Sequence, residues 1–218
     1  MSPRPHFQIA VLLSGNGTSL ENLFEHMDRG DVPGEVAVVI ASKEKAFGLE
    51  RARQRGVPAI AVPRAKYKDI RSFNDALHEA LEGYAVDLVA LLGFLSLFEL
   101  RGQYEGRVLN VHPALIPAFS GQGFYGQKVH EAVLASGVKI TGATVHFVNE
   151  QYDRGPILAQ EAVPVAENDS AQTLAARVQE AERRLVPRAI RWIAEGRVRI
   201  EDGRTRIQLP EKDPSQGA

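Results

Sequence analysis

The strongest constraint on the fold of this chain is a regular alternation of unbroken apolar runs with segments of helical spacing. The apolar runs lie at Phe7–Leu13, Val36–Ala41, Ala59–Val62 and Val86–Leu92. Such runs are typical of strands in a sheet that is covered on both faces. Helical spacing begins after Gly17 and recurs over residues 46–55 and 73–81. Strands that alternate with helices require crossover connections, so the sequence predicts an α/β fold with a doubly wound, mainly parallel sheet.

The second half of the chain predicts strands that run in opposite directions. Candidate strands cover Arg107–Val111, Lys139–Val148 and Ile157–Val165, with a helix near Gln127–Ala135. The connection Asn149–Pro156 is short and rich in turn-forming residues, so we expect the last two of these strands to be antiparallel neighbours. The predicted sheet is therefore mainly parallel, with antiparallel C-terminal strands.

A long helix is expected after these strands, with Asp169 or Ser170 as its N-cap. Proline removes a backbone donor, so Pro187 should kink or divide this helix. The segment Val198–Leu209 should form a hairpin around its Asp-Gly pair, and the polar tail from Pro210 should be loose.

Composition excludes several classes of function. The chain has 218 residues, a length that favours one domain over two. Its 26 Lys and Arg are balanced by 27 Asp and Glu, so no field over the whole surface attracts nucleic acid or anionic lipid. The absence of cysteine excludes disulfides, thiolate catalysis and cysteine-bound zinc. No apolar run reaches the ~20 residues of a membrane span and no signal peptide is recognisable, so we expect a cytoplasmic protein.

A glycine turn follows the first predicted strand, where Ser14-Gly15-Asn16-Gly17-Thr18 leads directly into a helix. Backbone N–H groups at a helix N-terminus are unpaired, the helix dipole is positive there, and glycines allow an anion to come close. The turn is either a phosphate site or the glycine turn that any doubly wound domain favours. A dinucleotide site is the weaker interpretation, because Leu20 replaces the third fingerprint glycine. A single phosphate fits this turn better than a pyrophosphate.

Asn110 and His112 occupy alternate positions of the strand that ends at Pro113, so their side chains share a face. Open α/β sheets bind ligands at the carboxyl ends of parallel strands. The pair is therefore either part of a site or a satisfied polar pair at a strand end. Asp153 precedes Gly155-Pro156, where aspartate alone usually indicates turn chemistry. Together, an amide, an imidazole and a carboxylate suffice for acyl-group chemistry, as oxyanion donor, proton carrier and tuning group.

The other histidines receive structural interpretations. His146 alternates with Thr144 on one strand face and is either a satisfied sheet histidine or a supporting partner of Asp153. His78 and His130 are expected on helix surfaces. His130 begins no His-Glu-x-x-His pattern, because Leu134 occupies the position of the second histidine, so the sequence predicts no metal site.

Four segments of the chain, in order, resemble those of a known enzyme family: IAVLLSGNGTS (9–19), LGFLSL (92–97), LNVHPALIP (109–117) and GATVHFVNEQYDRGPIL (142–158). They are similar to the folate-dependent formyltransferases, and the Ser-Gly-Asn-Gly turn is similar to that of the phosphoribosylglycinamide formyltransferases among them. The resemblance extends from Phe7 to Arg197. It implies transfer of a formyl group from 10-formyltetrahydrofolate to the amine of 5′-phosphoribosylglycinamide in purine biosynthesis. The expected partners are these two small molecules, and the expected enzyme is a monomer or homodimer without metal.

The resemblance also implies a role for each residue that matches the family's motifs. Asn110, His112 and Asp153 match catalytic residues: Asn110 and a protonated His112 donate to the formyl oxygen, and Asp153 favours the charged imidazole and assists proton transfer. The implied substrate-binding residues are Gly15, Asn16, Gly17, Thr18 and Ser19 for the phosphate, Gly93, and Glu182 for the ribose hydroxyls. The implied folate-binding residues are Phe94, Leu95, Ser96, Leu97, Phe98 and Asn110, with Lys68 and Arg71 as candidates for the glutamate tail.

On this basis, one formyltransferase domain (1–218) is expected to contain a phosphate-binding half (7–100), a catalytic and folate-binding half (101–197), and a C-terminal hairpin and tail (198–218). The chain departs from the family pattern at Ser19, where many members have Asn, and at Ser96, where many have Arg. The glycine-rich stretch Phe119–Gln127 is also unusual. The alternatives are a different 10-formyltetrahydrofolate-dependent formyltransferase, a formyltetrahydrofolate hydrolase, or a catalytically inactive ligand-binding module on the same fold.

Overall fold

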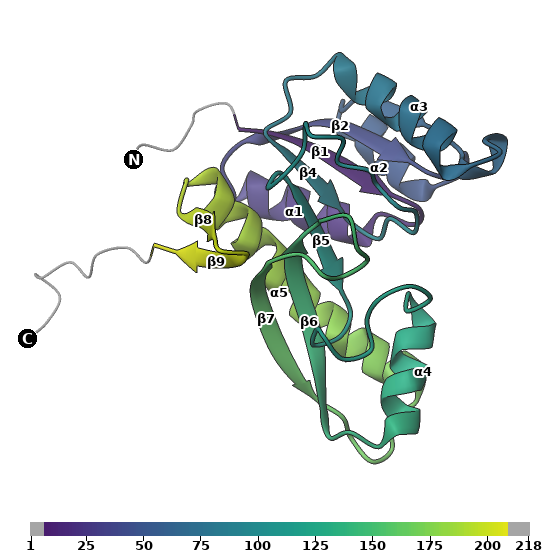
Figure 1. Cartoon of the computed structure of the whole chain (residues 1–218), viewed down its shortest axis with the longest axis vertical. Coiled ribbons are helices and arrows are strands. Elements are labelled where there is room, and N and C mark those ends of the chain that lie inside the picture. The colour runs from purple at the N-terminus through teal and green to yellow at the C-terminus, as the bar shows by residue number, and fades with distance from the viewer. Residues whose placement is uncertain (1–6, 209–218) are drawn as a thin grey trace, which may run out of the picture.

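The computed structural model describes residues 7–208, which form a seven-stranded sheet, a separate hairpin and five α-helices (Figure 1). The strands of the sheet are β1 Gln8–Leu13, β2 Glu35–Ala41, β3 Ala59–Ala61, β4 Leu88–Leu91, β5 Val108–His112, β6 Ile140–Phe147 and β7 Ile157–Pro164. The helices are α1 Thr18–Asp28, α2 Phe47–Gln54, α3 Ile70–Glu82, α4 Gln127–Ser136 and α5 Ala171–Ala194, with a short 3-10 turn at Arg64–Lys66. The hairpin pairs β8 Val198–Glu201 with β9 Arg204–Ile207.

The predicted sheet is confirmed in both of its parts. The strand order is β3-β2-β1-β4-β5-β6-β7, and the first five strands are parallel. β6 is antiparallel to β5. It is also antiparallel to β7, as the short connection between β6 and β7 predicts. The C-terminal hairpin is also confirmed. The tail from Pro210 lies outside the described residues.

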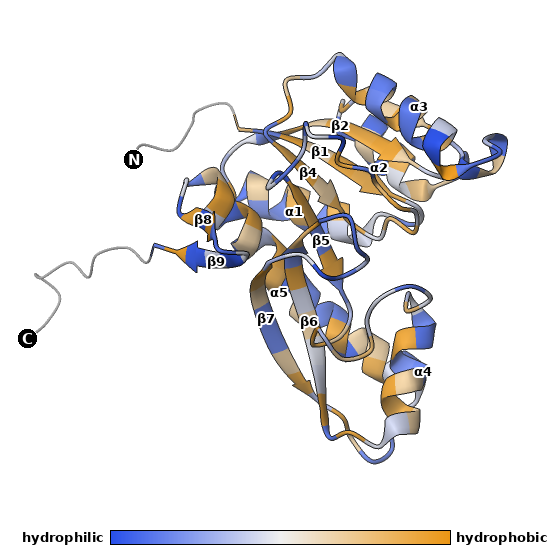
Figure 2. Cartoon of the chain, viewed as in Figure 1, coloured by the Kyte–Doolittle hydropathy of each residue, from blue (hydrophilic) through white to orange (hydrophobic). Residues whose placement is uncertain are grey.

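Side chains that alternate along the strands give the sheet two apolar faces. On β1, Ile9, Val11 and Leu13 belong to a core cluster that includes residues of α1, α2 and α5. Ala10 and Leu12 belong to a second cluster, which includes residues of α3. Figure 2 shows hydrophobic residues along β1, β2 and β4, between helices of mixed character. Helices therefore cover both faces, and the doubly wound arrangement is confirmed.

Two helices differ from their predicted form. α3 begins at Ile70, before the predicted start at Phe73, because the Asp69 carboxylate accepts the backbone N–H of Ser72 at 2.8 Å and caps the helix. α5 continues through Pro187, so the prediction that this proline divides the helix is wrong. Proline leaves the carbonyl four residues earlier without its helical donor.

The carbonyl that Pro187 leaves free is that of Arg183, and α1 supplies its donor. The side-chain amide of Asn22 donates to this oxygen at 2.8 Å. Because the backbone acceptor is satisfied by a neighbouring helix, α5 tolerates proline in its interior. Within residues 7–208, no helix is both long enough and apolar enough to cross a bilayer.

Candidate active site

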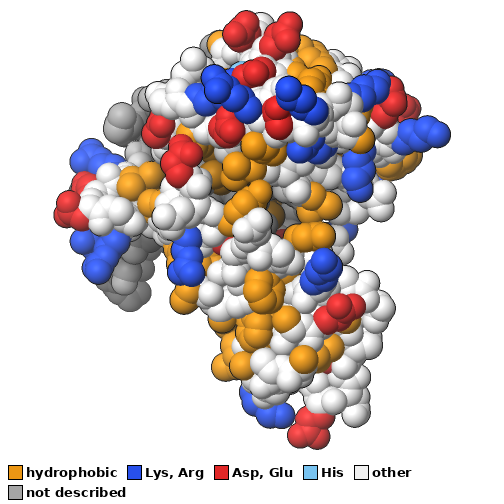
Figure 3. Space-filling view, turned by 45° about the vertical axis from the view of Figure 1, so that its right-hand side comes forward, with side chains coloured by type: hydrophobic (Ala, Val, Ile, Leu, Met, Phe, Trp, Pro, Cys, Tyr) orange, Lys and Arg blue, Asp and Glu red, His pale blue; other side chains and the backbone are white. Residues whose placement is uncertain are grey.

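A cavity of about 690 Å³ lies where β1, β4 and β5 end, and it extends along α5. Figure 3 shows hydrophobic side chains around the hollow in the middle of this face of the molecule. Its wall includes nearly all the residues that the resemblance singled out: Gly15, Asn16, Gly17, Thr18, Ser19, Gly93, Phe94, Leu95, Ser96, Leu97, Phe98, Asn110, His112, Asp153 and Glu182. Lys68 and Arg71 are exposed and do not line this cavity.

The glycine turn (residues 15–19) forms one end of the cavity. Gly17 is the N-cap of α1 with a φ of 69°, and no side chain caps the helix. A Cβ on Gly17 would lie 2.7 Å from the Cα of Gly48, so the close approach of α2 requires glycine at this position. The first N–H groups of α1 and their dipole are therefore directed at a concave, uncapped surface, which is the arrangement that binds anions.

Ser14 connects this turn to the segment after β4. Its hydroxyl accepts the backbone N–H of Leu95 at 2.9 Å and lies 2.6 Å from the Ser42 hydroxyl. Its own N–H donates to the carbonyl of Gly93 at 3.0 Å. The hydrogen bonds of Ser14 to Gly93 and Leu95 thus connect the glycine turn to the segment of residues 93–98.

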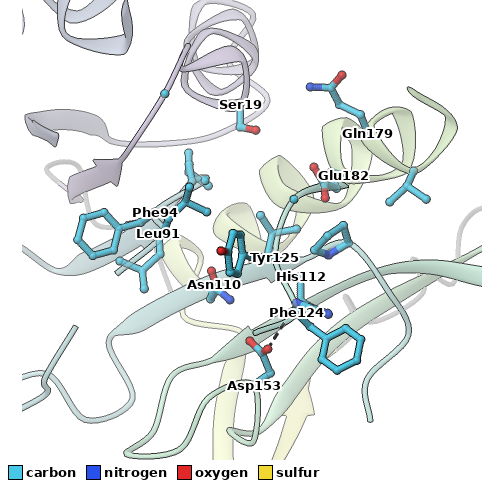
Figure 4. Close-up of a pocket in the computed structure, with 18 of the residues that line it drawn as sticks. Ser19, Leu91, Phe94, Asn110, His112, Phe124, Tyr125, Asp153, Gln179 and Glu182 are labelled. Atoms are coloured by element: carbon cyan, nitrogen blue, oxygen red, sulfur yellow. Dashed lines mark ion pairs between the residues drawn. The ribbon is translucent and has the colours of Figure 1, made fainter. Parts of the chain in front are cut away.

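The pairing of β5 with β6 brings the polar side chains of the site together. Asn110 is opposite His146, and His112 is opposite Thr144. Asp153 follows β6 and lies 3.5 Å from both rings, with Oδ2 facing His112 Nδ1 and Oδ1 facing His146 Nε2. Figure 4 shows Asn110, His112 and Asp153 below Ser19 and Gln179, with Glu182 of α5 between these groups. The predicted amide, imidazole and carboxylate therefore converge.

His146 fixes the orientation of the Asn110 amide. It is a buried sheet histidine and a neighbour of Asp153 at once, so both interpretations of this residue describe part of its role. Its Nδ1 lies 2.9 Å from the carbonyl of Phe147, which can only accept, so Nδ1 carries a proton. In the neutral ring Nε2 is then an acceptor for the Asn110 Nδ2, 3.2 Å away. One amide proton of Asn110 is used, and the other remains for a ligand.

His112 is held between two acceptors. Its Nε2 donates to the carbonyl of Phe119 at 2.8 Å, which leaves Nδ1 facing Asp153. Burial lowers the pKa of His112 below its usual value, although the Asp153 charge and the Phe119 carbonyl act in the opposite direction. The charge of Asp153 favours the protonated ring, but burial outweighs it, so the ring of His112 is neutral near pH 7.

Asp153 is ionised in the same environment. Burial alone would raise its pKa, but the adjacent ring of His146, the backbone N–H of Gly121 and the nearby ring of His112 lower it overall. The Gly121 N–H donates to Oδ2 at 2.9 Å. Asp153 has a φ of 53°, in the left-handed region that aspartate tolerates better than most residues. The loop of residues 119–127 is therefore bonded at its base to both His112 and Asp153.

Glu182 and Gln179 reach the cavity from α5, three residues apart on one side of the helix. Burial raises the pKa of Glu182 to about 7, so this carboxyl group changes charge near neutral pH. Gln179 donates to the hydroxyl of Thr18 at 3.2 Å, which connects α5 to the glycine turn. Sequence analysis missed Gln179, although helical spacing from Glu182 would have indicated it.

Several other residues were assigned wrongly or missed. His78 and His130 were expected on helix surfaces, but both are buried. His78 bonds the carbonyl of Glu99, whereas His130 lines the cavity and its Nδ1 has no partner among the described residues. Phe124 and Tyr125 also line the cavity. The only feature of the sequence that pointed to these two residues was the glycine-rich stretch in which they lie. No group of residues within 7–208 has the composition and geometry of a metal site.

Comparison with known proteins agrees with this geometry. Residues 7–190 match the family model for formyl transferases. The chloroplastic phosphoribosylglycinamide formyltransferase of Arabidopsis thaliana is 42% identical over 205 residues, which cover 92% of this chain and 70% of that protein. The phosphoribosylglycinamide formyltransferase of Haemophilus influenzae is 36% identical over 197 residues, covering 89% and 91%.

A solved structure shows the same likeness in three dimensions. Glycinamide ribonucleotide transformylase 1 from Symbiobacterium toebii superimposes with a TM-score of 0.86 at 44% identity, covering 93% of this chain and 94% of that one. The family model, the relatives and the shared architecture all extend over most of the chain. The chain therefore belongs to the formyl transferase family.

Proposed function

We propose that the chain transfers the formyl group of 10-formyltetrahydrofolate to the primary amine of 5′-phosphoribosylglycinamide, a step of purine nucleotide biosynthesis. One observation carries this proposal. A single cavity contains a glycine turn suited to a phosphate, an acid on α5 and the Asn110, His112 and Asp153 group. Relatives named for this activity support the choice of substrate among the reactions open to the family.

The sugar phosphate would lie along α5. Its phosphate would bind the N–H groups of the glycine turn, where α1 has no side-chain cap. Glu182 would accept hydrogen bonds from the ribose hydroxyls, and it lies between the turn and the catalytic group in Figure 4. A substrate bound at both points would direct its amine toward Asn110.

The folate would occupy the apolar side of the cavity. Leu91 and Phe94 are buried there, and Phe94 is stacked on Phe73 with ring centroids 6.2 Å apart. Leu95 and Tyr152 are 55% and 46% exposed although they line the cavity, so a flat heterocycle between them would bury apolar surface. Lys68 and Arg71 would meet the glutamate tail only if that tail extends beyond the cavity.

The chemistry follows from the charge that develops on the formyl oxygen as the amine attacks the formyl carbon. The free amide proton of Asn110 would stabilise that oxygen, and a proton gained at Nδ1 of His112 would do the same. Asp153 would stabilise the imidazolium as it forms. The resting ring is neutral, so His112 can take up the proton that the amine releases and pass it toward the departing folate nitrogen.

An absorbance assay tests the proposal by following the loss of the formyl group from 10-formyltetrahydrofolate. We expect deformylation only when 5′-phosphoribosylglycinamide is present, with one formylated amine formed for each folate released. Glycinamide without the ribose phosphate serves as the control and should react poorly, since it lacks the groups that the turn and Glu182 bind. Deformylation at the same rate without any amine would instead identify a hydrolase and overturn the proposal.

A further inference from the structure

We propose that Arg51 of α2 is a positioning residue for the substrate phosphate, because it holds the peptide between Asn16 and Gly17 with its N–H group toward the cavity. This inference rests on the proposed function, which places the phosphate at the glycine turn. Arg51 itself does not line the cavity, so it acts on the phosphate through the turn.

Three contacts hold the guanidinium group of Arg51 in place. Its Nε donates to the carbonyl oxygen of Asn16 at 2.9 Å, and its Nη1 lies 2.9 Å from the Glu21 carboxylate on α1. The Phe47 ring lies against the group, with its centroid 5.1 Å from Cζ. The Arg51 side chain is only 26% exposed. A planar group held on two edges and one face has little freedom to leave the turn.

α2 also donates a hydrogen bond to a second backbone carbonyl of the same turn. The backbone N–H of Gly48 donates to the carbonyl of Gly15 at 3.1 Å. The two segments also pack closely beside this contact, since a Cβ on Gly17 would lie 2.7 Å from the Cα of Gly48. The carbonyl oxygens of Gly15 and Asn16 are therefore both bound by donors from α2.

The direction of these carbonyls decides where the adjacent N–H groups point. In a trans peptide the C=O and N–H groups point in opposite directions, and the peptides of this turn are trans. The carbonyl of Gly15 shares a peptide with the N–H of Asn16, and the carbonyl of Asn16 shares one with the N–H of Gly17. Both N–H groups therefore point away from α2, and within residues 7–208 neither donates to a protein acceptor.

Without Arg51, the Asn16 carbonyl would lose its donor. The peptide could then rotate and present an oxygen, instead of an N–H group, to a phosphate dianion. Lysine would restore only part of the effect, because an ammonium group cannot reproduce the planar pair of contacts to Asn16 and Glu21. Arg51 therefore acts through the geometry of the turn more than through its charge, because the Glu21 carboxylate already balances the charge of the guanidinium group.

The variants Arg51→Gln and Arg51→Lys test this inference against the matched control Arg55→Gln. Arg55 also lies at the end of α2 and pairs with Glu21 at 3.3 Å and Asp28 at 2.6 Å, but it has no contact with the turn. We expect Arg51→Gln to raise the KM for the phosphorylated amine about tenfold, the effect of one lost charge-assisted hydrogen bond. The kcat and the KM for the folate should stay near those of the parent chain, and Arg51→Lys should lie between the two.

The affinity for inorganic phosphate, measured by calorimetry, provides a readout that does not depend on the reaction. Arg51→Gln should bind phosphate more weakly than both the parent chain and Arg55→Gln. Equal phosphate affinity in all three proteins would overturn the inference, and so would an equal rise in both KM values. Failure of the proposed function would look different, because the parent chain would bind phosphate at the turn and yet fail to formylate 5′-phosphoribosylglycinamide.

Discussion

Replacing Asp153 by Asn removes one negative charge from the centre of the site and almost preserves the volume of the side chain. The Asn oxygen can still accept the N–H of Gly121, so the loop should remain attached. What is lost is the attraction between Oδ2 and a proton on Nδ1 of His112. At their separation of 3.5 Å, this attraction amounts to ~4.7 kcal/mol for an effective dielectric constant of ~20.

This energy counts toward catalysis only if the imidazolium forms in the transition state. Because 1.36 kcal/mol corresponds to a factor of ten, we expect Asp153→Asn to lower kcat by about 10³. The KM values should change little, since Asp153 is assigned no contact with the phosphate or the ribose. The rate is measured with the absorbance assay under saturating substrate, and the fold is checked by circular dichroism.

A proton titration of His112 by NMR provides an independent check. The charge of Asp153 raises the pKa of His112, against the larger effect of burial. Removing that charge must therefore move the pKa of His112 further below its usual value. A kcat close to that of the parent chain, or an unchanged His112 pKa, would refute the assigned role.

Asp169→Asn is a matched control for the loss of a paired carboxylate. Asp169 lies 2.8 Å from Arg177, and its hydrogen bonds to Arg177 lower its pKa, but it does not line the cavity. This variant should lower the melting temperature and leave kcat unchanged. A comparable loss of turnover in both variants would show that the effect at Asp153 is not specific to the site.

Three further predictions concern other residues. Asn110→Ala should lower kcat by ~10²–10³, as the loss of one oxyanion donor does, and unchanged turnover would exclude the amide from that role. Since burial raises the pKa of Glu182 to about 7, the KM for the phosphorylated amine should fall as this carboxylate ionises with rising pH. Glu182→Gln should abolish the dependence. Thr144→Val should lower the free energy of unfolding in urea by ~1–3 kcal/mol per unpaired group. The Thr144 hydroxyl accepts the N–H of Ile116 at 3.1 Å and donates to the carbonyl of Ala114 at 2.7 Å, so an unchanged value would mean that both groups find other partners.

The strands were predictable because a strand that is buried on both faces has an unbroken run of apolar residues in the local sequence. The helix ends were less predictable, since they depend on single contacts. The cap that Asp69 provides moves the start of α3, and the Asn22 amide lets α5 pass through Pro187. In the second case the deciding donor lies on another helix, far away in the sequence.

Burial of the histidines could not be predicted in the same way. His78 and His130 are polar residues within helices, a pattern typical of a solvated face. His78 is buried because Phe98 stacks on it with ring centroids 5.2 Å apart. His130 is buried at the wall of a cavity that exists only where distant loops meet. A helical pattern records which side of a helix is apolar, but not what later packs over its polar positions.

The sequence by itself determined the fold class, the glycine turn and the identities of the amide, imidazole and carboxylate, because residue type and local spacing carry that information. The tertiary structure alone decided which atoms of these groups are free. Strand register aligns His146 with Asn110 and leaves one amide proton available, and the Phe119 carbonyl leaves Nδ1 of His112 facing Asp153. Hydrogen-bond direction and desolvation are set by neighbours that come together only on folding, so protonation states belong to the fold and not to the local sequence.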